Sequence, residues 1–105
     1  MGTPRRIRRT KGNLRRFEIE YGVRISQSLS KVGDAYVITA TASIDEYQYG
    51  IPAHVESIFV CGEARRTERL IARQRDEVIF DLAGRVNLYL ELHPDALPSL
   101  EEDTG

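Results

Sequence analysis

Apolar and polar side chains alternate strictly along residues 16–25. The apolar members stand at the odd positions Phe17, Ile19, Tyr21, Val23 and Ile25. A period of two directs successive side chains to opposite faces of a β-strand, so that one face is buried and the other is wet. The pattern therefore predicts a first strand over these residues.

Two further segments have strand character. Residues 35–44, AYVITATASI, are rich in β-branched side chains and follow a turn signal at Gly33-Asp34, so this strand is expected to pair antiparallel with the first. Residues 47–62 predict a third strand. Gly50 and Pro52 interrupt it and indicate a bulge or a sheet edge. Short connections between the three predict an antiparallel meander.

Residues 63–85 have a helical composition. A single straight helix would place Arg75 inside an apolar stripe, where a guanidinium group is expensive to bury. The stripe comprises Ile71, Val78, Leu82 and Val86. Either Arg75 extends outward to solvent, or the segment divides into two helices near residues 73–75. We favour the division, because Asp76 and Glu77 suit a new helix N-terminus.

Gly84 stands where a helix commonly ends. Beyond it the alternation of Val86, Leu88, Leu90 and Leu92 predicts a fourth strand that stops before Pro94. The expected fold is α+β: an antiparallel four-stranded sheet in the order β-β-β-α-β, with helix packed on one face. The helical stripe is expected to cover the apolar face of residues 17–25.

Charge is unevenly distributed along the 105 residues, although the net charge is −1. Residues 1–16 contain arginine and lysine without an acid, and residues 91–105 contain acids without arginine or lysine. We expect a basic flexible arm over residues 1–13, one domain over residues 14–98, and a short acidic tail over residues 99–105. The two ends should attract each other, within a chain or between chains.

The single cysteine, Cys61, excludes an intramolecular disulfide and favours a reducing compartment. No apolar run approaches the roughly 20 residues that span a bilayer, and the basic N-terminal stretch lacks the apolar core of a signal peptide. We therefore expect a cytoplasmic protein without a membrane partner.

Catalytic and metal-binding patterns are weak. His54 and Cys61 suggest a thiol–imidazole pair, but a lone cysteine in IFVCG is more typical of a buried apolar group. Two histidines and one cysteine match no metal-ligand spacing, and the glycines form no phosphate-binding loop. The prediction is a protein that is not an enzyme, with no metal and no cofactor.

The basic stretch RRIRRTKGNLRR, residues 5–16, is suited to salt-dependent binding of nucleic acid. It lacks interleaved aromatic residues, which a stacking platform for single strands needs. The alternative is a solvated arm, or an arm docked on the acidic tail or on a partner chain.

Aromatic residues near the third strand suggest another function. Tyr47, Tyr49 and Ile51 lie on the suspected edge, and Tyr21 and Tyr36 lie on the preceding strands. An open strand edge with amphipathic rings suits capture of an extended polypeptide. Phe80 lies off the helical stripe and is assigned to a contact with a second subunit. Alternatively, all of these residues belong to a core or a dimer interface, and the chain is a structural or adaptor subunit.

Three stretches carry a family resemblance. EVIFDLAGRVNLYLEL at residues 77–92, AYVITATASI at residues 35–44 and AHVESIFVCGE at residues 53–63 resemble SecB-like chaperones, particularly those of toxin-antitoxin systems. The resemblance covers about residues 17–92. It implies a four-stranded sheet, assembly into a dimer or tetramer, and nucleotide-independent binding of unfolded polypeptide. The expected client is an antitoxin or a secretory precursor.

Overall fold

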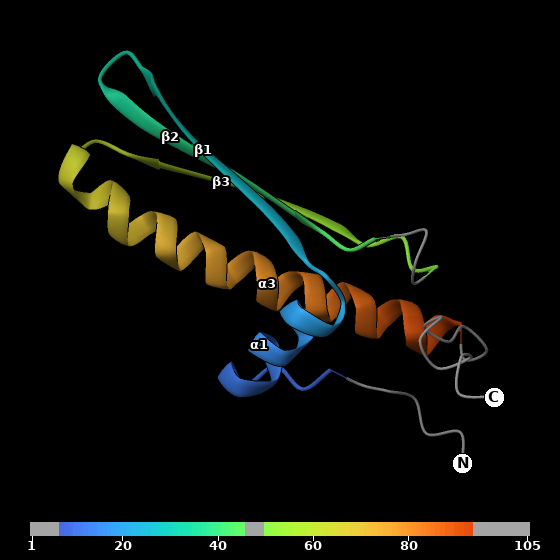
Figure 1. The fold of residues 1–105 in the computed structure, drawn as a ribbon. Helices are drawn as coiled ribbons and strands as arrows, with labels where there is room; N and C mark the ends of the chain where they lie inside the picture. Colours follow the sequence, from blue (N-terminus) through green and yellow to red (C-terminus); the bar gives the residue numbers. More distant parts are fainter. Residues whose placement is uncertain (1–6, 46–49, 94–105) are drawn as a thin grey trace.

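A computed structural model describes residues 7–45 and 50–93 (Figure 1). The elements in chain order are α1 (Lys11–Glu20), β1 (Arg24–Val32), β2 (Ala35–Ser43), β3 (His54–Cys61), the short 3₁₀ helix η1 (Ala64–Arg66) and α3 (Thr67–Leu92). The strands form one antiparallel sheet in the order β1-β2-β3. The helix α3 runs along one face of this sheet, and α1 lies beside α3 (Figure 1).

The predicted α+β class and the antiparallel meander are confirmed, but the prediction of four strands is wrong. Residues 86–92, expected to be the last strand, continue α3, and the described sheet has three strands. Their alternation is misleading because Val86 and Leu90 are four apart and extend the buried stripe from Leu82. Leu88 and Leu92, also apolar, are simply exposed.

The predicted first strand is also wrong over most of its length. Residues 11–20 form α1, and β1 begins only at Arg24. Leu14, Phe17 and Tyr21 are spaced by three and four residues, which places them on one helical face. The Phe17 and Tyr21 rings pack with their centroids 5.1 Å apart, whereas Ile19 is 75% exposed. Residues four apart fit both the two-residue period of a strand and the repeat of a helix. Here the helical repeat is the correct interpretation.

A glycine at residue 22 ends α1. Its φ of +58° lies in the left-handed region that glycine adopts without strain. The Gly22 amide donates to the Ile19 carbonyl at 3.3 Å, and the Val23 amide donates to the Glu18 carbonyl at 3.0 Å. This is a Schellman motif, which satisfies the last carbonyls of the helix and redirects the chain into β1.

The predicted break within the second helical segment is wrong. The helix α3 is continuous over 26 residues. Arg75 extends outward, its side chain is 44% exposed, and it pairs with Glu18 of α1. The outward orientation, weighed above as the alternative, is therefore the correct one.

Gly84 does not end a helix but provides space for a basic side chain. A Cβ atom at this position would lie 2.9 Å from the Arg9 Nη1 atom, and the Arg9 guanidinium stands 4.3 Å from the centroid of the Phe80 ring. Next to this contact the Ile7 amide donates to Asn87 Oδ1 at 2.7 Å, and Asn87 Nδ2 donates to the Ile7 carbonyl at 2.8 Å. The segment before α1 is thereby attached along α3.

The basic arm expected over residues 1–13 is described only from Ile7 onward. Its described part lies against α3 and enters α1, so the expected boundary between residues 13 and 14 falls inside a helix. Residues 1–6 and the expected acidic tail lie outside the described residues.

The core lies between α3 and the inner face of the sheet. Of the predicted stripe, Val78, Leu82 and Val86 are fully buried, whereas Ile71 is only partly buried. The three fully buried residues belong to one cluster with Ala40 and Ala42 of the central strand β2, whose small side chains let the helix approach the sheet closely. The stripe thus covers mainly β2 and β3, and not the residues 17–25 that the sequence suggested.

Gln74 is a fully buried polar residue in this interface. Its Nε2 atom donates to the carbonyls of Ile38 at 2.9 Å and of Ser57 at 3.2 Å. The Gln27 Nε2 atom donates to Gln74 Oε1 at 3.0 Å and to the Ile71 carbonyl at 2.9 Å. One pair of carboxamides therefore connects α3 with all three strands.

Leu82→Ala is expected to lower the free energy of unfolding by about 2–5 kcal/mol, because the cavity left between helix and sheet cannot collapse completely. Urea denaturation followed by circular dichroism measures this loss. An unchanged urea midpoint would contradict the core assignment.

Gln74→Met is expected to cost about 1–3 kcal/mol, because it keeps the side-chain volume but removes the donor to two strands and leaves the Gln27 amide with one acceptor fewer. A double-mutant cycle with Gln27→Met measures the coupling. Since both changes remove the same bond between the carboxamides, the double variant should be more stable than the sum of the two losses predicts. Strict additivity would show that the two amides do not interact.

Gly84→Ala is expected to raise the free energy of unfolding by up to about 1 kcal/mol, because alanine is the better helix former. The added methyl group meets only the flexible end of Arg9, which can turn away. Denaturation measures the gain, with Gly12→Ala in α1, where a Cβ meets nothing within 4 Å, as a matched helical control. A destabilised Gly84→Ala variant beside a stabilised Gly12→Ala variant would show that the Arg9 contact contributes more than helix propensity.

Candidate functional site

The sheet has an inner face, packed on α3, and an outer face that no described element covers. The register places alternate residues of each strand on this outer face. Those of β1 are mostly serines, and those of β2 are mostly threonine, serine and small apolar residues. Figure 1 shows the three strands as a single layer with helices on one side only.

Four apolar residues gather on the outer face toward the β1–β2 turn. We name Val32, Val37, Ile58 and Val60 the outer apolar patch. Val37 is directly opposite Val60 in the register, and Ile58 is opposite Thr39. Val32, Ile58 and Val60 are 64%, 67% and 64% exposed. Large apolar side chains exposed together in this way are typical of an interaction surface.

Both β1 and β3 are edge strands, because β2 lies between them. Each edge therefore has one side on which the main chain pairs with no described strand. The two edges differ in their outer side chains. β1 carries Ser26, Ser28 and Ser30 with one apolar residue, Val32, at its end, whereas β3 carries His54 and Glu56 at one end and the adjacent apolar pair Ile58 and Val60 at the other. A segment that paired with β3 would find apolar neighbours for its own side chains. The edge of β3 with the outer apolar patch is therefore the candidate binding site.

The residues predicted for polypeptide binding are not brought together at this site. Tyr21 and Ile51 are buried in the core. Tyr36 lies on the inner face of β2, half-buried, with the Lys31 ammonium 5.6 Å from its ring centroid. Tyr47 and Tyr49 lie outside the described residues. Of the expected set, the three described residues thus include none on the outer face.

Phe80, predicted to contact a second subunit, lies on the side of α3 away from the sheet. It is 41% exposed, and the Arg9 guanidinium of the same chain stands over its ring. Phe80 lies off the buried stripe, and its ring contacts Arg9 of the same chain. The residual exposure leaves its edge open.

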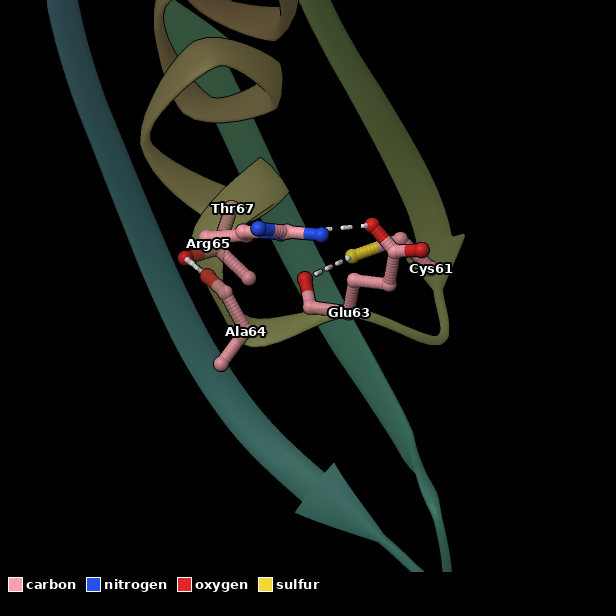
Figure 2. Close-up of polar contacts among 5 residues, drawn as sticks. All are labelled: Cys61, Glu63, Ala64, Arg65 and Thr67. Atoms are coloured by element: carbon pink, nitrogen blue, oxygen red, sulfur yellow. Dashed lines mark hydrogen bonds and ion pairs between the residues drawn. The ribbon is translucent and has the colours of Figure 1, made fainter.

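The sequence candidates for catalysis are far apart. His54 and Cys61 stand at the two ends of β3, about 23 Å apart at the rise of an extended strand. His54 Nε2 instead lies 3.1 Å from the exposed Glu56 carboxylate. The Cys61 thiol donates to the Glu63 carbonyl at 3.5 Å in the turn that leads into α3 (Figure 2). Residues 7–45 and 50–93 therefore contain no thiol–imidazole pair, and they hold no group of three potential metal ligands.

The turn after β3 is a compact connection. Thr67 Oγ1 donates to the Ala64 carbonyl at 2.7 Å and so satisfies one acceptor of η1 (Figure 2). The Arg65 guanidinium lies 3.9 Å from the Glu63 carboxylate. The connection brings the chain from the sheet to the start of α3 within a few residues.

Ile58 and Val60 were missed by the sequence reasoning, although a signal for them exists. From Glu56 onward β3 reads ESIFVC, so apolar residues occupy both parities at Ile58, Phe59 and Val60. A strand with one wet face alternates, whereas an uninterrupted apolar run indicates that both faces meet apolar material. Only Phe59 of this run faces α3. No described element covers the other two residues.

Within the described ranges, no helix is long and apolar enough to cross a membrane. Comparison of the chain with family models, with curated proteins and with solved structures finds no match.

Proposed function

We propose that this protein binds extended polypeptide without nucleotide, along the edge of β3 and over the outer apolar patch. The observation that carries the proposal is the position of Ile58 and Val60, both about two-thirds exposed, beside a strand edge that no described segment occupies. An added strand gains main-chain hydrogen bonds from the edge and burial of its alternate side chains from the patch.

The geometry favours a client segment with apolar side chains at alternate positions. Each strand that joins a sheet directs every second side chain to the outer face. There it would meet Ile58 and Val60, while the intervening side chains would turn toward Phe59, which is half-buried on the inner face. Charged side chains commonly protect an edge, and the carboxylate on β3, that of Glu56, lies at one end of the strand beside His54.

The SecB-like resemblance supports the same class of function. It implies a cytoplasmic chaperone for an antitoxin or a secretory precursor. The proposal does not require the fourth strand, because the candidate site lies on the three strands of the described sheet. It moves the binding surface to the outer face of the sheet, opposite the face on which Tyr36 lies.

Assembly into a homo-oligomer is part of the proposal. A sheet of three strands with only one face covered buries little surface for a chain of this length, and a second copy is one way to add to it. A dimer or tetramer is expected, in a reducing compartment such as the cytoplasm, where the lone thiol of Cys61 persists.

The test is a double substitution, Ile58→Thr with Val60→Thr, in the full chain. Threonine keeps the strand propensity and removes most of the exposed apolar surface. The purified wild-type protein is expected to suppress aggregation of an unfolded client measured by light scattering, and the double variant is expected to lose most of this activity. The matched control is Ile19→Gln with Leu88→Gln, which removes two other exposed apolar residues, from α1 and α3.

Three outcomes contradict the proposal. One is absence of protection by the wild-type protein. Another is equal loss in the control, which would indicate nonspecific adsorption to any apolar side chain. The third is a mass measurement in which Ile58→Thr with Val60→Thr converts a dimer into a monomer without changing client protection, because the patch would then be a subunit interface.

A further inference from the structure

Basic residues gather on the side of the molecule away from the sheet, although the whole chain has a net charge of −1. Two neighbouring hollows lie there. The first lies between α1 and α3 and is lined by five basic and three acidic residues. The second lies at the start of α3, and it is lined by four arginines and no acid. Arg73 lines both, so the two hollows adjoin each other.

Basic residues at the end of η1 and in the first half of α3 form an exposed stripe. Arg66, Arg69 and Arg73 follow one another at spacings of three and four, which places them on one side of the helix. All three are exposed, and Phe80 with Arg9 above it continues the same side. From residue 65 to residue 80 this side extends about 22 Å along the helix axis, and Asp76 and Glu77 lie on it between Arg73 and Phe80.

Part of this charge is not neutralised by the chain itself. Arg73 pairs with Glu77 at 3.1 Å, and Arg75 pairs with Glu18. By contrast, the described part of the chain provides no ion pair for Lys11, Arg15, Arg66 or Arg69. Like charges three and four apart on a helix repel each other, so an external anion would relieve this repulsion.

We propose that this surface, formed by η1, the first half of α3 and the start of α1, binds the sugar-phosphate backbone of nucleic acid. Its basic residues are arginines except for Lys11, and the planar guanidinium binds two phosphate oxygens at once. Its length suits an anion with regularly repeated charges better than a single small anion. The site is therefore on the helices and extends far beyond the basic N-terminal stretch that the sequence suggested.

We expect binding on this surface to depend on the charge of the phosphates and not on the base sequence. The aromatic ring among the lining residues, Phe80, already has the Arg9 guanidinium on its face. Bases therefore find no free stacking platform there. The expected signature is affinity that falls steeply with salt and is similar for different sequences.

The test uses the full chain and fluorescently labelled nucleic acid, either a DNA duplex of about 20 base pairs or a single-stranded RNA of about 20 nucleotides. Fluorescence anisotropy is measured between roughly 50 and 200 mM salt. The triple variant Arg15→Ala, Arg66→Ala, Arg69→Ala is expected to bind at least about tenfold more weakly at the lowest salt, with a salt slope reduced by about 2–3.

A matched control removes the same number of positive charges elsewhere. Arg24, Lys31 and Arg85 line neither hollow, and Arg24→Ala, Lys31→Ala, Arg85→Ala should retain the affinity within about threefold. Circular dichroism establishes that both variants are folded. The Ile58→Thr, Val60→Thr variant should bind nucleic acid like the wild type, which separates this inference from the polypeptide-binding proposal.

The inference is overturned if the wild-type chain binds neither probe at the lowest salt. Equal loss in the two triple variants would also overturn it, because net charge and not this surface would then control binding. Displacement of the duplex by poly-glutamate at the same concentration of charge would assign the surface to acidic polypeptide instead.

Discussion

The contact between α3 and the inner face of the sheet is the interaction on which the remainder of the structure depends. The sheet has three strands, and α3 is the element that covers its inner face. Ala40 and Ala42 permit a close approach, and Val78, Leu82 and Val86 fill the interface. Gln74 fixes the position of the helix along the sheet, because its amide must reach the Ile38 and Ser57 carbonyls at once. A helix displaced by one turn would leave these groups unpaired.

The same contact explains how much of the fold the sequence could predict. Turn signals and β-branched runs predicted β2 and the β1–β2 turn, and helical spacing predicted the buried stripe. Residues 17–25 and 86–92 were assigned to strands because apolar residues four apart also satisfy a period of two. Gly84 was read as a helix end because the approach of Arg9, 75 residues away in the chain, is not visible locally. Contacts between residues far apart in the sequence decide both features. Arg9 approaches Gly84, and Arg75 extends outward to pair with Glu18.

The candidate sites show a corresponding limit. Tyrosines were selected for their chemistry, but burial of Tyr21 in the core depends on α1, which the strand assignment concealed. The exposure of Ile58 and Val60 depends on which face α3 covers, and α3 covers the face of Phe59. A division of residues 63–85 into two helices does not place the arginines of this segment on one side. One continuous helix aligns Arg69 and Arg73, so the molecule has an exposed apolar patch on the sheet and a group of arginines on the helix.

The carboxamide of Gln27 has a consequence for how the native state opens. The helix lies mainly under β2 and β3, so β1 is attached to the body through its ladder with β2, the partly buried Ile25 and this one side chain. Regions with few buried contacts unfold locally at a lower free energy than the core. Release of β1 would expose the edge of β2 while the remaining two strands stay on the helix. Amide protons of β1 would then exchange with solvent earlier than those of β3, and the central strand would become transiently available as a second pairing edge.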